Sequence, residues 1–231
     1  MDDRRLAFIR ELEQADEAVS VVLIELDELY EECERVRERA LELEAFFVRL
    51  PDTSTAMSVA VEESGTRAAE AQEAHERALE ELRAAQTEDA AERLAAARRF
   101  ELRTRDALTI AARRLREAEA DAARLELEAN AAHQESEELG RRAEALAAAL
   151  RERPRLAGEA GELQGTSLAA IADWGTRARA ALLVARGQLA AERDAVVRQA
   201  NELGALVLGE PLTATSAAGV ARQVERELGA R

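Results

Sequence analysis

The chain holds 231 residues, of which 34% are charged and only 3% aromatic, and its formal net charge at pH 7 is −15. Few aromatic side chains argue against a bulky globular core, and the negative charge disfavours binding of nucleic-acid phosphate or anionic lipid over the chain as a whole. All 32 basic residues are arginines, which excludes lysine Schiff-base chemistry and a Walker-type phosphate loop. Alanine, glutamate, arginine and leucine dominate, a composition typical of coiled coils and long helices.

The first predicted helix covers about 3–50. From Phe8 to Leu50, apolar or small residues recur at alternating steps of four and three, which is the heptad pattern of a coiled coil. Further apolar residues, among them Tyr30, fall on the adjoining e position and widen the stripe, so this helix should contact more than one partner helix. The predicted helix interface is centred on Val19, Val22, Leu26, Leu29 and Tyr30.

Pro51 is predicted to end this helix, because proline cannot continue the ladder of backbone hydrogen bonds. The chain is then expected to turn back and to form one very long central helix over about 55–152, so that residues 1–153 make a long coiled-coil hairpin with Leu26 beside Leu79. The heptad pattern of the second helix contains a four-residue stutter. It leaves open the alternative that the chain kinks or turns near Gln86–Ala90.

A flexible connector is predicted over 154–166, where Pro154 and three glycines follow one another at short intervals. A returning helix over about 167–208 is expected to pack antiparallel on the second half of the long helix, with Trp174 over Ala143 and Gly175 admitting a close approach. A short C-terminal helix over about 216–229 follows. The predicted fold class is therefore all-α, an elongated antiparallel coiled coil built of long helical hairpins.

The predicted register brings like charges together. The acidic run from Glu25 to Glu34 would lie beside Glu70, Glu73, Glu76 and Glu80, and facing like charges destabilise a helix pair modestly. Either these side chains point outward, or the true partner of the first helix is another chain.

One segment, residues 93–116, is basic. It holds eight arginines against Glu101 and Asp106. One interpretation is a site that binds phosphate or other negative charge, on nucleic acid, a lipid headgroup or an acidic partner helix. The other is that the patch neutralises acidic residues at the start of the first helix, namely Asp2, Asp3, Glu11 and Glu13. The second interpretation is favoured, since Phe100 is the one aromatic residue that accompanies the arginines. The candidate patch comprises Arg93, Arg98, Arg99, Arg103, Arg105, Arg113, Arg114 and Arg116.

No pattern in the sequence predicts an enzyme. His75 and His133 lie far apart, and no zinc spacing, nucleophile elbow or phosphate loop is present. We therefore assign no catalytic, cofactor-binding or metal-binding residue, and expect no cofactor and no small-molecule substrate. Cys33, at an inward heptad position, is expected to be a small core residue.

The sequence favours a cytoplasmic protein, because it opens with no signal pattern and the apolar run at 21–26 is too short to span a bilayer. We expect a non-catalytic coiled-coil scaffold or adaptor that acts through protein partners, including copies of itself. Two alternatives remain: an all-helical protein that remodels membrane surfaces, and a nucleic-acid-associated coiled coil that uses residues 93–116. Both are disfavoured by the acidic charge.

Overall fold

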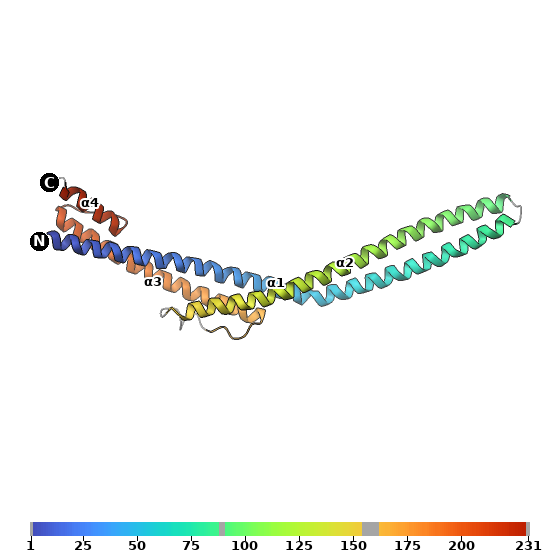
Figure 1. The fold of residues 1–231 in the computed structure, drawn as a ribbon, viewed down its shortest axis with the longest axis horizontal. Coiled ribbons are helices and arrows are strands. Elements are labelled where there is room, and N and C mark those ends of the chain that lie inside the picture. The colour runs from blue at the N-terminus through green and yellow to red at the C-terminus, as the bar shows by residue number, and fades with distance from the viewer. Residues whose placement is uncertain (1, 88–90, 154–161, 230–231) are drawn as a thin grey trace. The chain divides into compact units, whose positions relative to one another are not determined.

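The computed structural model describes residues 2–87, 91–153 and 162–229, and over these ranges it contains four helices and no strand (Figure 1). The prediction of an all-α fold is confirmed. None of the helices in the described part of the chain has an apolar stretch long enough to cross a bilayer. The helices are α1 (Asp2–Thr87), α2 (Ala91–Arg151), α3 (Leu168–Leu208) and α4 (Ala217–Gly229).

The predicted break at Pro51 is wrong, because α1 continues through it to Thr87. The inward heptad stripe passes the proline in unbroken phase, from Leu50 to Met57 and Val61, so that α1 packs along α2 on both sides of Pro51. Threonine hydroxyls nearby bond to backbone carbonyls of the same turn, including Thr55 to the carbonyl of Pro51. Packing on both sides therefore offsets a helix defect that costs about 3 kcal/mol in isolation.

The very long central helix over 55–152 is wrong as well. The chain reverses between Thr87 and Ala91, so the alternative of a turn near Gln86–Ala90 is the one that the structure supports; residues 88–90 themselves lie outside the described residues. Two pairs show the antiparallel course of the helices. His75 Nδ1 lies 3.3 Å from Thr104 Oγ1, and the rings of Phe47 and His133 lie 4.7 Å apart.

The chain divides into two compact units. One comprises residues 1–42 and 137–231 and is called the bundle unit here; the other comprises residues 43–136 and is called the hairpin unit. The hairpin unit consists of the second half of α1 and most of α2. The bundle unit consists of the first half of α1, the end of α2, and α3 and α4.

In the bundle unit, both α3 and the end of α2 run antiparallel to α1. Arg193 and Arg186 of α3 pair with Asp16 and Asp27 of α1, in reverse order along the chain. Arg142 of α2 likewise pairs with Glu32 of α1. Therefore α2 and α3 run parallel to each other, and the predicted antiparallel return of residues 167–208 on the second helix is wrong. Residues 154–161 of the predicted connector lie outside the described residues.

The predicted clash of like charges does not arise, because arginines lie where glutamates were expected. The acidic run of α1 faces α2 and α3: Arg153 pairs with Glu25 at 2.9 Å and Arg179 with Glu34 at 2.6 Å. The prediction that Leu26 lies beside Leu79 is wrong, because both residues belong to the one continuous helix α1. Arginines from two helices neutralise the acidic face of α1.

The core of the bundle unit is built of large side chains in close contact. Trp174, Leu182 and Leu150 are almost completely buried. Gly175 lets α3 approach α1, because a Cβ atom at this position would lie 2.9 Å from Cβ of Arg37 and 3.4 Å from the carbonyl oxygen of Cys33. The expected close approach at Gly175 is thus present, and α1 is the helix approached.

The short helix α4 folds back over the ends of α1 and α3. Its buried residues Val220 and Val224 join Ile9 and Leu12 of α1 and Val207 of α3 in one apolar cluster. The reversal begins at Gly209, which ends α3 with a φ of 83°, a conformation that favours glycine. In Figure 1, α4 lies beside the ends of α1 and α3.

Candidate interaction surface on the hairpin unit

The interior of the hairpin unit is narrow and made of small residues. Apart from Leu43, its fully buried side chains among the described residues are small: Ala78, Ala85, Ala97, Thr104 and Ala132. Thr104 places a polar hydroxyl in this interior, and the hydroxyl donates a hydrogen bond to a backbone carbonyl of its own helix. Two long helices thus meet along a thin seam, which leaves most of each helix surface open to solvent.

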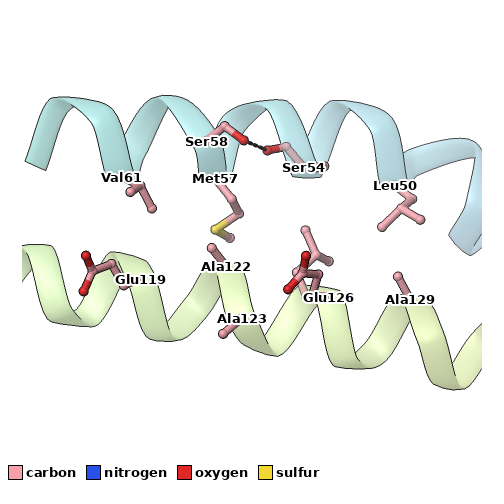
Figure 2. Close-up of a pocket in the computed structure, with 11 residues that line it drawn as sticks. Leu50, Ser54, Met57, Ser58, Val61, Glu119, Ala122, Ala123, Glu126 and Ala129 are labelled. Atoms are coloured by element: carbon pink, nitrogen blue, oxygen red, sulfur yellow. Dashed lines mark hydrogen bonds between the residues drawn. The ribbon is translucent and has the colours of Figure 1, made fainter. Parts of the chain in front are cut away.

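A groove of about 470 Å³ lies along this seam, where α1 has passed Pro51. Figure 2 shows Met57 of α1 pointing toward α2, whose alanines, including Ala122 and Ala129, form the opposite wall. Carboxylates of Glu119 and Glu126 line the same groove. The groove offers apolar contact area and negative charge, but no nucleophile paired with a base.

The eight arginines of the candidate patch all lie exposed on α2 in the hairpin unit. Arg113 pairs with Glu117 of its own helix at 2.8 Å, and this contact raises the pKa of Arg113 further. Arg99 and Arg116 donate to carbonyl oxygens of their own helix. No described carboxylate lies within ion-pair distance of the following members of the patch: Arg98, Arg99, Arg103, Arg105, Arg114 and Arg116.

The interpretation that the patch neutralises the start of the first helix is wrong. The basic segment of α2 packs against the end of α1, as the contact between His75 and Thr104 shows. The residues expected as its partners, Asp2, Asp3, Glu11 and Glu13, belong to the bundle unit. The predicted hairpin that joined the two segments required a turn at Pro51, and α1 has none.

The predicted interface residues of the first helix lie in the bundle unit. Leu26 is 3% exposed, while Val19, Val22, Leu29 and Tyr30 are half-buried. Arg179 of α3 donates to the hydroxyl of Tyr30 and lies 4.8 Å from the centre of its ring. Tyr30 is therefore held by a helix of its own chain.

Cys33 is a buried core residue of the bundle unit. Burial raises the pKa of its thiol to about 12, and the neighbouring carboxylate of Glu32 adds to the effect. A thiol with this pKa is neutral at physiological pH and is a poor nucleophile. Within the described residues, no group of three or more His, Cys, Asp and Glu side chains is placed to hold a metal ion.

Sequence reasoning missed two polar residues that fix the bundle unit. The carboxylate of Asp16, in a residue 4% exposed, accepts from Arg193 Nε at 2.7 Å and from the backbone N–H of Ala217, the first residue of α4, at 2.9 Å. Asn201 of α3 both donates to and accepts from the backbone of Ala214. A signal was present, since Asn201 is one of two asparagines in the chain and Asp16 adjoins the heptad stripe.

No protein family, curated protein or solved structure matches this chain.

Proposed function

We propose that the chain is a non-catalytic cytoplasmic scaffold or adaptor, in which the bundle unit provides most of the stability and the hairpin unit binds other proteins through its helix surfaces. The observation that carries the proposal is the thin, mostly alanine seam of the hairpin unit, which leaves large apolar side chains of both its helices exposed. Val48 is 73% exposed, Leu127 70% and Ile110 54%. Such side chains supply the apolar area that a partner helix would bury, with charged residues at the rim.

The chemistry of the interior supports a binding role over catalysis. The one thiol of the chain is buried with a raised pKa, and the groove of the hairpin unit holds carboxylates without a neighbouring base or nucleophile. An antiparallel helix pair of this kind presents two parallel rows of side chains, which suits recognition of another helix in an extended groove.

The test is affinity capture with the full chain, followed by cross-linking and mass spectrometry. Because the chain lacks lysine, the cross-linker must react with carboxylates. We expect proteins other than the chain itself to be cross-linked to acidic residues of the hairpin unit, such as Glu62, Glu119 and Glu126, all of which are exposed.

A matched pair of variants locates the binding surface. Replacing Val48, Val59 and Phe100 with serine removes exposed apolar area from the hairpin unit, and replacing Leu183 and Val184 does so in the bundle unit. The first variant should lose the captured proteins while its thermal unfolding is unchanged, and the second should keep them. Failure of the wild-type chain to capture any protein, or loss of capture with the second variant alone, would contradict the proposal.

A further inference from the structure

The outer surface of α2 in the hairpin unit changes sign near its middle. Residues 93–116 hold eight arginines and two acidic residues, a net charge of +6, whereas residues 117–136 hold six acidic residues and one arginine, a net charge of −5. Two ion pairs in these segments, Arg113 with Glu117 and Arg124 with Asp121, join residues of the same helix. The helix therefore presents a basic half and an acidic half to its surroundings.

Members of both halves lie on a single face. Arg99, Arg103 and Arg114 precede Glu117, Asp121 and Glu128 at separations of 4, 11, 3, 4 and 7 residues, which are all close to whole turns of an α-helix. Each of these six side chains is exposed. They form one stripe, called the charged stripe here, along an exposed flank of α2, and Arg114 in its middle also lines a groove beside Ser64 and Ala71 of α1.

Apolar side chains border the charged stripe. Leu102 is 52% exposed, Ile110 54% and Leu127 70%. These residues lie outside the heptad positions of α2 that face α1, and Ile110 also lines the groove that Arg114 shares with α1. Solvated charges alone would explain an exposed helix face; the three large apolar residues add contact area that a second helix on this face would bury.

We propose that this face binds a second copy of the same chain, with the two α2 helices antiparallel and centred between Arg114 and Glu117. In that register Arg114 lies opposite Glu117 of the other copy, and Arg103 lies opposite Glu128. Leu102 comes close to Leu127. The two-fold symmetry makes every such contact twice. This inference rests on the proposed function, for which it names one partner and the surface used.

The charge pattern favours a second copy over nucleic acid. A phosphate backbone long enough to follow the basic half would continue past residue 116 into a segment of net charge −5, where it is repelled. The arginines are accompanied by a single aromatic residue, Phe100, for stacking on bases. A parallel pair of copies is disfavoured too, because it would set arginine against arginine along the stripe.

Complementary charge reversal tests the pairing directly. One variant changes Arg99, Arg103 and Arg114 to Glu, so that the whole charged stripe is acidic; the other changes Glu117, Asp121 and Glu128 to Arg, so that the whole charged stripe is basic. Light scattering should give a dimer for the wild-type chain at tens of micromolar and low salt, and a monomer for each variant alone. An equimolar mixture of the two variants should give a dimer again, since their stripes are complementary.

The control changes Arg49, Arg77 and Arg83 of α1 to Glu. These residues are exposed in the same hairpin unit, and the net charge changes by the same amount, but they lie on the other helix. This variant should remain a dimer. Circular dichroism of all variants reports whether they keep their helix content.

Cysteine cross-linking tests the antiparallel direction. In a Cys33→Ala background, Glu117→Cys lies near the two-fold axis and should form a disulfide-linked dimer on oxidation. Arg99→Cys should not, because in an antiparallel pair the two copies of residue 99 are about 50 Å apart at a rise of 1.5 Å per residue. Linkage through both positions would indicate a parallel pair and overturn the inference.

Other results also overturn it: a monomeric wild-type chain, variants that still dimerise alone, or a mixture that stays monomeric. Retention of the wild-type chain on duplex DNA at about 0.15 M salt, abolished by the arginine-to-glutamate changes, would assign the patch to nucleic acid instead. The proposed function fails separately, when affinity capture yields no partner. A monomeric chain that still captures other proteins would refute this inference and leave the proposed function standing.

Discussion

The two units use their charged residues in different ways. In the bundle unit, arginines of α2 and α3 pair with acidic residues of α1 across the helix interface, at distances such as 2.7 Å for Arg193 and Asp16. In the hairpin unit, ion pairs such as Arg67 with Glu63, Arg113 with Glu117 and Arg124 with Asp121 join neighbours three or four residues apart on one helix. Charge that crosses an interface specifies which helices pack together, whereas charge kept within a helix leaves its outer surface free to select a partner.

The interiors of the two units also differ, in the size of the side chains that they bury. The bundle unit buries Trp174, Ile171 and Leu182, and the hairpin unit buries mostly alanine. Burial of a large apolar side chain stabilises a fold by about 1.5–3 kcal/mol, and alanine contributes far less. The bundle unit should therefore hold most of the stability of the chain, and four predictions test this comparison.

The largest effect is expected for Leu26→Asp in the bundle unit. Leu26 is 3% exposed, so the change removes a packed side chain and buries a carboxylate, and we expect the free energy of unfolding to fall by about 4 kcal/mol. Leu125→Asp in the hairpin unit should cost about half as much, because this half-buried residue lines an open groove and water can solvate the new charge. Urea unfolding measures both values. Glu31→Gln, at an exposed position, is the control that should change little, and equal costs at Leu26 and Leu125 would remove the distinction between the units.

Pro51→Ala should stabilise the hairpin unit. Alanine restores the backbone donor that proline lacks and removes the clash of its ring with the preceding turn, an effect of up to about 3 kcal/mol. Hydrogen exchange of the peptides that cover residues 43–61 should slow accordingly. The control Asp52→Ala should shift stability by no more than about 0.7 kcal/mol. Unchanged exchange in Pro51→Ala would show that packing on α2 already absorbs the defect.

The helices after residue 166 were predictable, but the turn of the hairpin was placed at the wrong position. Ser167 caps α3 and Gly209 ends it, as cap and breaker residues indicate. Pro51 is a local signal of the same kind, yet tertiary packing overrides it, and the unbroken heptad phase from Leu50 to Met57 was the better guide. The four-residue stutter before Leu94 marked the true reversal. The heptad pattern changes phase there because α1 and α2 each have their own inward stripe.

Partner helices were harder to predict than helix limits. A heptad stripe shows which face of α1 is buried, but it does not show against which segment. The acidic run from Glu25 to Glu34 was the available clue, since it required arginines opposite, and Arg179 and Arg186 of α3 are such residues. Asp16 and Asn201 bond to backbone groups that come close only after α4 has folded back. No local pattern contains that information.

Asp16→Ala should loosen α4 without unfolding the rest of the bundle unit. The change leaves the N–H of Ala217 and the guanidinium of Arg193 without the acceptor that they share, and loss of buried acceptors of this kind costs about 1–3 kcal/mol. Hydrogen exchange of residues 217–228 measures the effect. The control is Asp27→Ala, which removes an ion pair whose side chains are half exposed and should cost at most about 1 kcal/mol. Equal effects of the two changes would mean that Asp16 contributes only as a surface charge.

The smallest effect is expected when arginines are changed to glutamine in each unit. The free energy of unfolding should then change in opposite directions in the two units. Arg98, Arg99, Arg103 and Arg105 of the hairpin unit have no carboxylate partner among the described residues, so their loss relieves repulsion within a basic helix. We expect stability to rise by up to about 0.5 kcal/mol at low salt. Arg142, Arg179, Arg186 and Arg193 of the bundle unit each pair across an interface, so their loss should lower stability by as much as about 1 kcal/mol per pair. Both effects should shrink in concentrated salt, which screens exposed charges. Urea unfolding measures both effects, at a chain concentration low enough to prevent association. If the hairpin variant lost as much stability as the bundle variant, the patch would be neutralised within the chain. It would then not be a surface left open for a partner.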